Sequence, residues 1–431
     1  MKELVGNLKG DRVIWSFVAL LALFSFMPVF SASSNLAYMN HGTGNTISFL
    51  LKHLAHIFIG FIIIFWVHKV PYHYYKGISK IALPIVWLLL GYTLFKGTVI
   101  AGANASRWIQ VPFLGITFQT STVASIVLML YVARYLSKKS EEEVTFQASF
   151  KELWLPVFGT LMLILPANFS TAALIFSMVL MLTFIGRYPL RYIGFILGAG
   201  IAALALFILL AKAFPDSHFF SRVDTWSSRI ENFTTSKPGE DDYQIEKAKI
   251  AIASGGIYGL GPGKSVQKHF LPQSSSDFIY AIIVEEWGLI GGFGVLFMYL
   301  LLFLRFIVAA HKANSLFGKL LVVGLGFPMI FQAMINMAVA VELLPVTGQT
   351  LPLISSGGSS IWMTCIALGI IINVTKKEEE IAQEISDKVK REAALQKLID
   401  KQLENENEND AEESYSIQDN TVNPMNAVLN K

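Results

Sequence analysis

The chain has 431 residues, of which 53% are hydrophobic and 15% are charged, with a formal net charge of +3. Soluble domains carry roughly 25% charged residues, so this composition excludes an ordinary soluble protein and indicates an integral membrane protein. The apolar runs are continuous rather than alternating, which excludes a strand barrel. Nothing in the charge balance points to a nucleic-acid partner, and none is expected.

Ten apolar runs are candidates for crossing a hydrocarbon core, which takes about 20 residues each. They fall near residues 13–31, 49–67, 81–99, 118–136, 153–166, 170–186, 190–213, 278–304, 318–341 and 357–375. The predicted fold is therefore an all-α polytopic membrane protein with ten transmembrane helices. The fifth and sixth runs are separated only by the Pro166 region, so Leu153–Ile185 could also form one long interrupted helix.

Basic residues in the short loops predict the orientation. Lys and Arg precede the first run and recur in every second short loop, whereas Ser31–Thr46 and Glu342–Ser355 contain neither. Because basic loops remain cytoplasmic, both termini are expected inside. Residues 214–276, between the seventh and eighth helices, then form one large extracytoplasmic loop. The first run followed by Ser31-Ala32-Ser33 could instead be a cleaved signal peptide, but its removal would break the charge alternation.

The predicted organisation is a cytoplasmic N-terminus (1–12), a membrane domain (13–375) and a cytoplasmic tail (376–431). The tail starts with a charged, helix-like stretch and ends in ENENENDAEESYS, which is too polar to bury a core. A solvated helix followed by disorder is one interpretation; a docking helix for a cytoplasmic partner is the other. Cys365 is the single cysteine, so no internal disulfide is possible.

Asp277 is the first candidate for chemistry. It is the only acid in Leu271–Ala281 and lies where the long external loop enters an apolar run. Acids in or beside membrane spans are costly and usually face a water-filled cavity. A water-exposed carboxylate at a cavity mouth is a good general base. The alternative is structural, because a helix that starts at Phe278 would have Asp277 as its N-cap.

Glu285 and Glu286 follow in the same apolar run. On a continuous helix Glu285 would lie about 12 Å further along than Asp277 and about 80° round, whereas Glu286 would point to the opposite side. The two are not expected to serve one pocket. We expect Glu285 to line the cavity and Glu286 to make an interhelical polar contact, with a purely structural role as the alternative for either residue.

The other polar features of the outer side each have a structural and a functional interpretation. Arg107 could anchor the headgroup boundary or bind an anionic headgroup such as pyrophosphate, for which a guanidinium is well shaped. The glycines of GLGPGKS (259–265) lack the phosphate-loop spacing, and we expect them to permit sharp turns and a close approach to the bilayer or a ligand. His53 and His56 are expected to pack rather than to bind metal.

A further segment, Asn336–Ser360, joins the last two runs and contains Pro345, Gly348, Pro352, Gly357 and Gly358. Non-helical backbone at membrane depth survives only where it is buried in protein or lines a cavity. A re-entrant, cavity-lining segment is therefore predicted, with Ser355, Gly357 and Gly358 among the substrate-contacting positions.

These segments resemble the SEDS family of peptidoglycan polymerases (shape, elongation, division and sporulation proteins). The resemblance rests on PQSSSDFIYAIIVEEWG, on NMAVAVELLPVTGQTLPLISSGGSS and on the shorter blocks GANASRWI and FQTST. It covers residues 10–375. The sequence departs from the family pattern at Thr122, Ser125 and Asn168, where the family has glutamate, lysine and aspartate, so an ion-pair network in the cavity is not carried over.

The resemblance implies a glycosyltransferase that polymerises lipid II. Asp277 would take the proton from the acceptor sugar's 4-hydroxyl, and undecaprenyl pyrophosphate would leave. Arg107, Lys264 or a divalent cation such as Mg or Mn would stabilise the leaving group, and Glu285 would contribute to the substrate-binding cavity. No other cofactor is implied.

Within the family, the QTLPLISSGGSS ending and the long acidic tail resemble the division members (FtsW) more than the elongation members (RodA). The implied partners are a class B penicillin-binding protein, an FtsI-like transpeptidase, and other division proteins. The implied location is the septum in the bacterial cytoplasmic (inner) membrane. An elongation polymerase, a lipid II flippase and a non-catalytic division scaffold are the alternatives.

Overall fold

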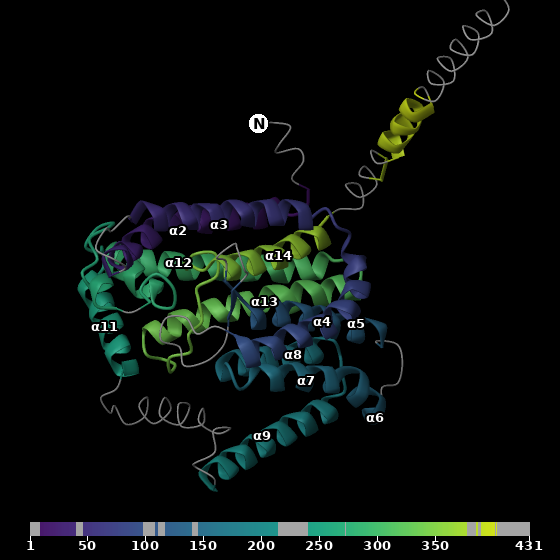
Figure 1. Cartoon of the computed structure of the whole chain (residues 1–431), viewed down its shortest axis with the longest axis horizontal. Coiled ribbons are helices and arrows are strands. Elements are labelled where there is room, and N and C mark those ends of the chain that lie inside the picture. The colour runs from purple at the N-terminus through teal and green to yellow at the C-terminus, as the bar shows by residue number, and fades with distance from the viewer. Residues whose placement is uncertain are drawn as a thin grey trace, which may run out of the picture. The chain divides into compact units, whose positions relative to one another are not determined.

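The computed structural model describes residues 9–39, 46–97, 108–110, 117–139, 145–213, 240–271, 273–376, 385–386, 389–400 and 402. The chain divides into two compact units, Met1–Thr375 and Lys376–Lys431. In the second unit residues 389–400 are helical and exposed, with apolar side chains such as Leu395 and Leu398 in solvent. The first unit is a bundle of helices (Figure 1).

Each of the ten apolar runs coincides with a helix of the described part of the chain. These helices are α2 (Arg12–Met39), α3 (Thr46–Val67), α4 (Tyr75–Lys96), α5 (Thr120–Lys138), α7 (Leu155–Ile164), α8 (Phe169–Ile185), α9 (Leu190–Ala213), α12 (Ile279–Lys312), α13 (Leu316–Ala340) and α14 (Gly358–Val374). Among the described residues, six helices are long and apolar enough to cross a membrane: α2, α3, α4, α5, α12 and α13. That all ten cross stays a prediction.

The fifth and sixth runs form two helices rather than one interrupted helix. A turn at 165–168 separates α7 from α8, and the side chain of Asn168 caps α8 by accepting a hydrogen bond from the Thr171 N–H at 3.1 Å. The short helix α6 (Phe146–Ser149) and a π-helical turn, Phe150–Trp154, lead into α7.

Two short strands and two 3₁₀ turns lie outside the apolar runs and were not predicted from the sequence. Strands β1 (Trp108–Gln110) and β2 (Thr117–Gln119) pair antiparallel, with Trp108 opposite Gln119. The 3₁₀ turns η1 (Tyr72–Tyr74) and η4 (Gln267–His269) lie in connections. The charged run of the long loop forms a further helix, α11 (Glu240–Gly255).

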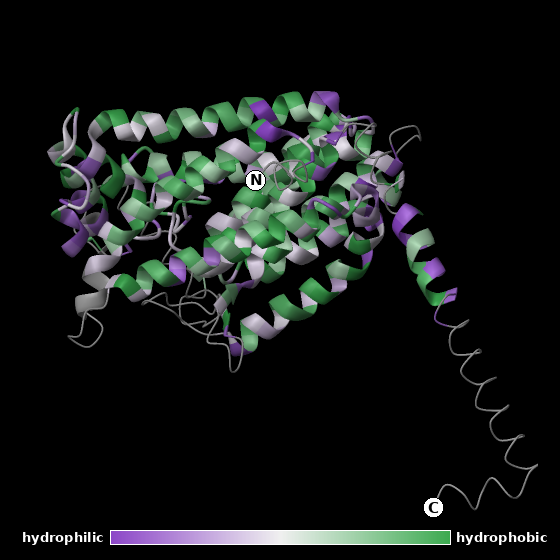
Figure 2. Cartoon of the chain, turned by 90° about the horizontal axis from the view of Figure 1, so that it is seen from above, coloured by the Kyte–Doolittle hydropathy of each residue, from purple (hydrophilic) through white to green (hydrophobic). Residues whose placement is uncertain are grey.

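Helix α13 lies at the centre of the first unit, where it packs against α5, α8, α12 and α14, while α3 packs against α2 and α14. Gly326 of α13 lets the Phe306 ring of α12 approach, since a Cβ there would lie 2.7 Å from the ring. The outer helix faces are strongly hydrophobic (Figure 2). On α9, for example, Phe195, Ile201 and Leu209 are exposed, as lipid-facing side chains would be.

One end of the bundle is tied by polar contacts between segments that were predicted to lie on the same side. Arg305 Nε is 2.6 Å from Asp11 Oδ2, and the Asp11 N–H donates to Thr375 Oγ1 at 2.9 Å. The Tyr72 N–H donates to Asn373 Oδ1 at 2.8 Å. The first residues described, the connection between α3 and α4, the last part of α12 and the end of α14 therefore meet at one end. Which side of a membrane this end faces stays a prediction.

Helix α12 contains a break that the sequence did not reveal. Gly288 has φ 66° and ψ −169°, so two helices meet across a kink at this residue. Non-glycine residues essentially do not adopt this conformation. The part before the kink, Ile279–Trp287, is called here the short helix; Leu289–Lys312 is called the long helix.

Candidate functional site

Asp277 lies in a turn that ends at the start of the short helix. The helix begins at Ile279 with Phe278 as its N-cap, which has no side-chain cap bond, so Asp277 is not the N-cap. The alternative that Asp277 serves as the N-cap of this helix is therefore wrong. The side chain is half-buried, whereas residues 278–286 behind it are buried throughout. Asp277 is thus the partly accessible front of an otherwise buried element.

The re-entrant segment between α13 and α14 holds the backbone on both sides of Asp277. The Asn336 Nδ2 group donates to the Asp277 carbonyl at 2.7 Å. Ser355 Oγ donates to the Ser276 carbonyl at 2.6 Å, and the Ser356 N–H donates to the Ser275 carbonyl at 2.8 Å. Three successive carbonyls are therefore fixed, which leaves the Asp277 backbone little freedom.

The contacts of Ser355 revise its predicted role. Its hydroxyl donates to Ser276 and accepts from the Leu351 N–H at 2.7 Å, and the residue is 3% exposed. Ser355 therefore holds the turn that carries Asp277 rather than meeting a substrate. The cause is local: the serine closes the turn Leu351–Ser355, so its hydroxyl faces inward.

Gly357 and Gly358 begin α14 and also take structural roles. A Cβ on Gly358 would lie 2.4 Å from the His56 ring, so the glycine makes room for this imidazole. Gly357 is the N-cap of α14 with extended backbone. His53 bonds to Ser25 Oγ at 2.8 Å and is buried, so the expected packing role of the two histidines agrees with their contacts.

Glu285 does not line an open cavity, which corrects its predicted role. The carboxylate is 0% exposed. It accepts hydrogen bonds from the Val266 N–H at 2.9 Å, from the Gln267 N–H at 3.1 Å and from the Ser265 hydroxyl. The cause is the returning loop, whose backbone amides surround the end of the short helix and replace water around the charge.

Glu286 makes the interhelical contact that was expected. Its Oε1 accepts a hydrogen bond from Ser31 of α2, and also one from the Ser265 N–H at 3.3 Å. Lys268 is close by, with its Nζ 3.2 Å from Ser31 Oγ and 2.7 Å from the Gly263 carbonyl. The expectation that the two glutamates serve different places is wrong, since both hold Ser265.

Backbone hydrogen bonds complete this attachment, called here the clasp: residues 255–268 held on the short helix and the kink. The Leu260 N–H donates to the Glu285 carbonyl at 2.9 Å, and the Gly261 N–H donates to the Glu286 carbonyl at 3.0 Å. Gly259 has φ 81°, and a Cβ there would lie 2.2 Å from the Glu286 carbonyl oxygen. The glycines permit close approach as predicted, but to a helix of the same chain.

The structure does not bring Lys264 next to Asp277. The Lys264 N–H donates to the Gly261 carbonyl, and Gly261 is bonded to Glu286 at the rear of the short helix. Asp277 precedes the front of that helix, and nine residues of helix extend about 13 Å. Arg107 lies outside the described residues. Of the two proposed cations, only Lys264 can therefore be located, and it lies away from the carboxylate.

A cavity of about 80 Å³, lined mainly by apolar side chains, lies between α5, α13 and α14. Its polar lining comes from Thr122, Ser125, Gln332, Ser360 and Thr364, and no charged side chain is among its described lining residues. Two of the three positions that depart from the family pattern therefore lie in this cavity. Its lining can offer hydroxyl and amide groups but not an ion pair.

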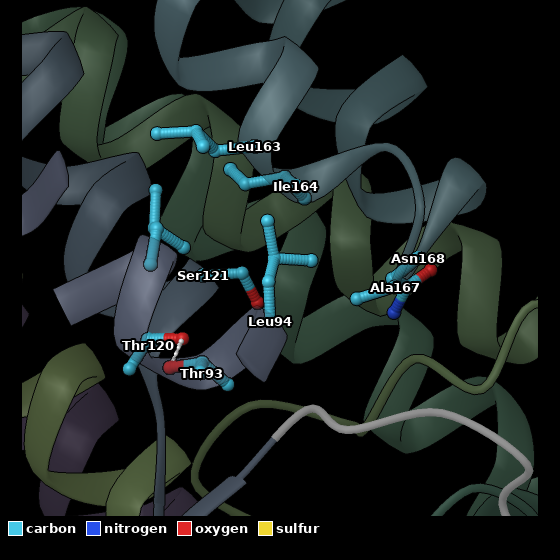
Figure 3. Close-up of a pocket in the computed structure, with 9 residues that line it drawn as sticks. Thr93, Leu94, Thr120, Ser121, Leu163, Ile164, Ala167 and Asn168 are labelled. Atoms are coloured by element: carbon cyan, nitrogen blue, oxygen red, sulfur yellow. Dashed lines mark hydrogen bonds between the residues drawn. The ribbon is translucent and has the colours of Figure 1, made fainter. Parts of the chain in front are cut away.

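The third departing residue, Asn168, lines a smaller hollow of about 10 Å³ between α4, α5 and the turn before α8 (Figure 3). The Thr93 and Thr120 hydroxyls face each other there at 3.1 Å. This volume admits about one water molecule, so a headgroup does not fit.

A chain of side-chain contacts leads from this hollow to the Asp277 turn. Asn168 caps α8 at Thr171, Thr171 Oγ1 accepts from Gln349 Nε2 at 3.0 Å, and the Gln349 carbonyl accepts from Asn336 Nδ2 at 2.7 Å. Asn336 then reaches Asp277. Asn168 therefore has a structural role that an uncharged side chain can fill.

Asn336, Gln349, Ser265 and Lys268 are contributors that sequence reasoning missed. An amide within an apolar run, as at Asn336, was an available signal, because buried polar side chains need partners. Nothing in the sequence indicated that Ser265 would contact both glutamates.

No group of three or more His, Cys, Asp or Glu side chains that could hold a metal ion occurs among the described residues. A divalent cation at Asp277 would therefore take most of its ligands from elsewhere. Mg²⁺ commonly does so, with one or two carboxylates supplemented by substrate phosphates and water.

Apolar helices around a polar re-entrant segment, with one clamped, half-buried carboxylate beside it, define a polytopic membrane protein with a polar site at the carboxylate. The sequence profile of the FtsW/RodA/SpoVE family, described as "Cell cycle protein", matches residues 11–380. The chain belongs to this family, which is the SEDS family.

Similar sequences span almost the whole membrane unit. A protein of Thioalkalivibrio sulfidiphilus (strain HL-EbGR7) named "Probable peptidoglycan glycosyltransferase FtsW" is 30% identical over 368 residues, covering 84% of this chain and 89% of that protein. A Geobacter sulfurreducens (strain DL-1 / KN400) protein with the same name is 31% identical over 375 residues, covering 85% and 95%. "Stage V sporulation protein E" of Bacillus subtilis (strain 168) is 28% identical over 368 residues, covering 85% and 97%.

Solved structures share the fold. One, described as "Structural coordination of polymerization and crosslinking by a peptidoglycan synthase complex", matches with a TM-score of 0.66 at 24% identity, covering 85% of this chain and 97% of that one. The rod shape determining protein RodA of Thermus thermophilus matches with a TM-score of 0.60 at 23% identity, covering 85% and 96%.

Proposed function

We propose that this protein is a peptidoglycan glycosyltransferase that polymerises lipid II, with Asp277 as the general base. Family membership and relatives named as glycosyltransferases support the activity. The observation that carries the assignment of the base is the combination of a half-buried carboxylate with a backbone fixed at Ser275, Ser276 and Asp277. A base needs this combination of access and fixed position.

The reaction is a single displacement. The Asp277 carboxylate takes the proton of the 4-hydroxyl of the acceptor sugar, and the hydroxyl oxygen forms a bond to the anomeric carbon of the donor glycan. The bond from that carbon to the pyrophosphate oxygen breaks, and undecaprenyl pyrophosphate leaves with the electron pair. The anomeric centre is inverted. The described contacts of Asn336 and Ser355 keep the carboxylate in place during this step.

The leaving pyrophosphate gains negative charge and needs a cation. A divalent cation held jointly by Asp277 and the phosphates would supply this stabilisation, as would Arg107. Lys264 is less suited, because its neighbour Gly261 is bonded at the other end of the short helix.

The test is polymerisation by the purified full chain supplied with lipid II in detergent. Asp277→Asn should reduce turnover by about 10²–10⁴-fold, the usual contribution of a general base. Glu246→Gln is the matched control, because it removes one exposed acid from α11. Full activity of Asp277→Asn would remove the carboxylate from the mechanism.

The same assay separates the other candidate functions. A lipid II flippase would form no glycan in detergent, where two membrane sides do not exist. A non-catalytic scaffold would also form none, yet would still assemble with its partners. Wild-type glycan formation therefore contradicts both.

We further propose that the protein serves septal synthesis in the bacterial cytoplasmic membrane, together with a class B penicillin-binding protein and other division proteins. Relatives named FtsW support the division role, and the structural neighbour described as coordinating polymerisation with crosslinking supports such a partner. Septal fluorescence of a tagged copy is expected. Lateral-wall fluorescence would favour the elongation role instead.

A further inference from the structure

The clasp contains a tight turn, Gly255–Gly261, called here the outer hairpin, that exposes large apolar side chains. Tyr258 is 82% exposed, Ile257 60% and Leu260 39%. Gly256, Gly259 and Gly261 have φ of 54°, 81° and 101°, which lets the backbone turn back on itself. A turn of this shape does not require apolar residues at its exposed tip. The exposed apolar side chains therefore indicate that the tip contacts something other than water.

The hydrogen bonds of the hairpin fix its depth relative to the membrane. The Leu289 N–H donates to the Gly256 carbonyl at 2.9 Å, and the Ile290 N–H donates to the Ile257 carbonyl at 3.3 Å. Ile257 is therefore level with the first turn of the long helix. Backbone N–H groups at the start of a membrane span cannot bond to water and need acceptors in the protein. The hairpin supplies two such acceptors, its carbonyl groups at Gly256 and Ile257.

The long helix has the length of one membrane crossing. Leu289–Lys312 extends about 36 Å at 1.5 Å per residue, slightly more than a hydrocarbon core of about 30 Å. Its last turn carries His311 and Lys312, which suit the opposite headgroup region. Leu289 and Ile290 then lie at the outer edge of the hydrocarbon, and so does the hairpin bonded to them.

The outer flank of the long helix continues the apolar surface of the hairpin. Ile290, Phe293 and Phe297 are 59%, 63% and 60% exposed, which is the pattern of a lipid-facing helix side. Ile290 is bonded to the hairpin at Ile257, so the two apolar surfaces adjoin. An exposed cation, Lys264, lies beside Gly261, with Nζ 3.8 Å from where a Cβ on that glycine would be.

We propose that the outer hairpin inserts its apolar tip into the outer-leaflet boundary and so anchors the clasp to the lipid. Tyr258 places its ring in the upper acyl chains and its hydroxyl at the headgroup level, where tyrosine is enriched, and Lys264 meets phosphate groups. Ile257 and Leu260 enter the upper acyl chains. The anchor holds the C-terminal end of the short helix at a fixed height relative to the membrane. Asp277 lies just before the N-terminal end of the same helix. This anchoring does not require glycan synthesis.

Site-specific fluorescence of the full chain in phospholipid nanodiscs tests this anchor. Tyr258→Cys in a Cys365→Ser background is labelled with the environment-sensitive dye NBD. We expect blue-shifted emission, quenching by lipids that carry a doxyl group high on the acyl chain, and protection from aqueous iodide. Glu246→Cys on α11, labelled in the same way, should be quenched by iodide and not by the doxyl lipids.

Two results would overturn the proposal. One is iodide quenching at position 258 equal to that at position 246. The other is protection at position 258 that appears only after a partner protein is added, which would make the hairpin a protein interface. Because the label replaces an exposed residue, folding of the labelled chain can be checked by its thermal transition before the quenching experiment.

Discussion

The side-chain amide of Asn336 contacts the carbonyls of Asp277 and Gln349, each at 2.7 Å. One buried side chain of α13 thus joins the turn that carries the proposed base to the re-entrant segment. The residue is 1% exposed, so water cannot replace it. The position of Asp277 is therefore coupled to the folding of the re-entrant segment, Asn336–Ser360, which begins 59 residues later in the chain.

Asn336→Leu should impair catalysis and stability together. The leucine keeps the volume but leaves one buried and one part-buried carbonyl without their donor, at a cost of about 1–3 kcal/mol for a buried unsatisfied group. We expect a lower Tm and a kcat that falls more than KM changes. Gln332→Leu is the control, because Gln332 lies one turn earlier and donates to Thr350 rather than to Asp277. Equal kcat losses in both variants would contradict a specific role for Asn336.

Replacing either of the two glutamates that bind the clasp by glutamine should give different results. Both oxygens of Glu285 accept hydrogen bonds, so Glu285→Gln turns an NH₂ group toward N–H or O–H donors. Glu286 Oε2 has no hydrogen-bond partner, so Glu286→Gln can keep its Oε1 contacts. The first variant should lower Tm more and expose residues 255–268 to limited proteolysis. A larger effect of Glu286→Gln would contradict this account.

Gly288→Ala should prevent the clasp from forming. The backbone conformation at Gly288 is essentially restricted to glycine and costs about 1–3 kcal/mol for other residues. In addition, the new Cβ would lie 2.2 Å from the Ile257 carbonyl oxygen. Gly294→Ala lies two turns later and meets nothing within 4 Å, so it should be neutral or slightly stabilising. Thermal unfolding of the purified variants checks the contrast.

Adjacent glycines at the start of α14 should give opposite results. Gly358→Ala places a methyl group 2.4 Å from the His56 ring, whereas a Cβ on Gly357 would meet only Ser360, at 3.7 Å. We expect a clear loss of stability for the first and little change for the second. Adding His56→Ala should recover part of the loss from Gly358→Ala. Additive effects in this double-mutant cycle would show that the imidazole is not the cause.

Helix positions followed from the sequence because apolar length is a strong signal. The run predicted at 318–341 became α13 (Leu316–Ala340), and the run at 190–213 became α9 with the same bounds. The separation of α7 from α8 was left open by the sequence and depends on a cap, Asn168, at the start of the second helix.

The kink could not be predicted in the same way. Gly288 lies in an apolar stretch, and a glycine inside a membrane helix is common, so a continuous helix was the natural expectation. The conformation at Gly288 is favoured only because the hairpin carbonyls accept from Leu289 and Ile290. Such a contact joins residues that are far apart in sequence. For the same reason the cavity-lining prediction for Glu285 failed, since its partners are backbone amides of the returning loop.

The break at Gly288 also separates the short helix from the long helix, which an unbroken helix would join into one rigid element. Membranes differ in thickness, and a span adapts to hydrophobic mismatch by tilting. Hydrogen bonds from residues 256–261 hold the backbone on both sides of the glycine, from Glu285 to Ile290, so the angle between the two helices is fixed. Only Leu289–Lys312 needs to match the lipid, and a change in bilayer thickness is then taken up at the inner end of this helix. The proposed base keeps its elevation over the outer headgroups in thin and thick bilayers alike.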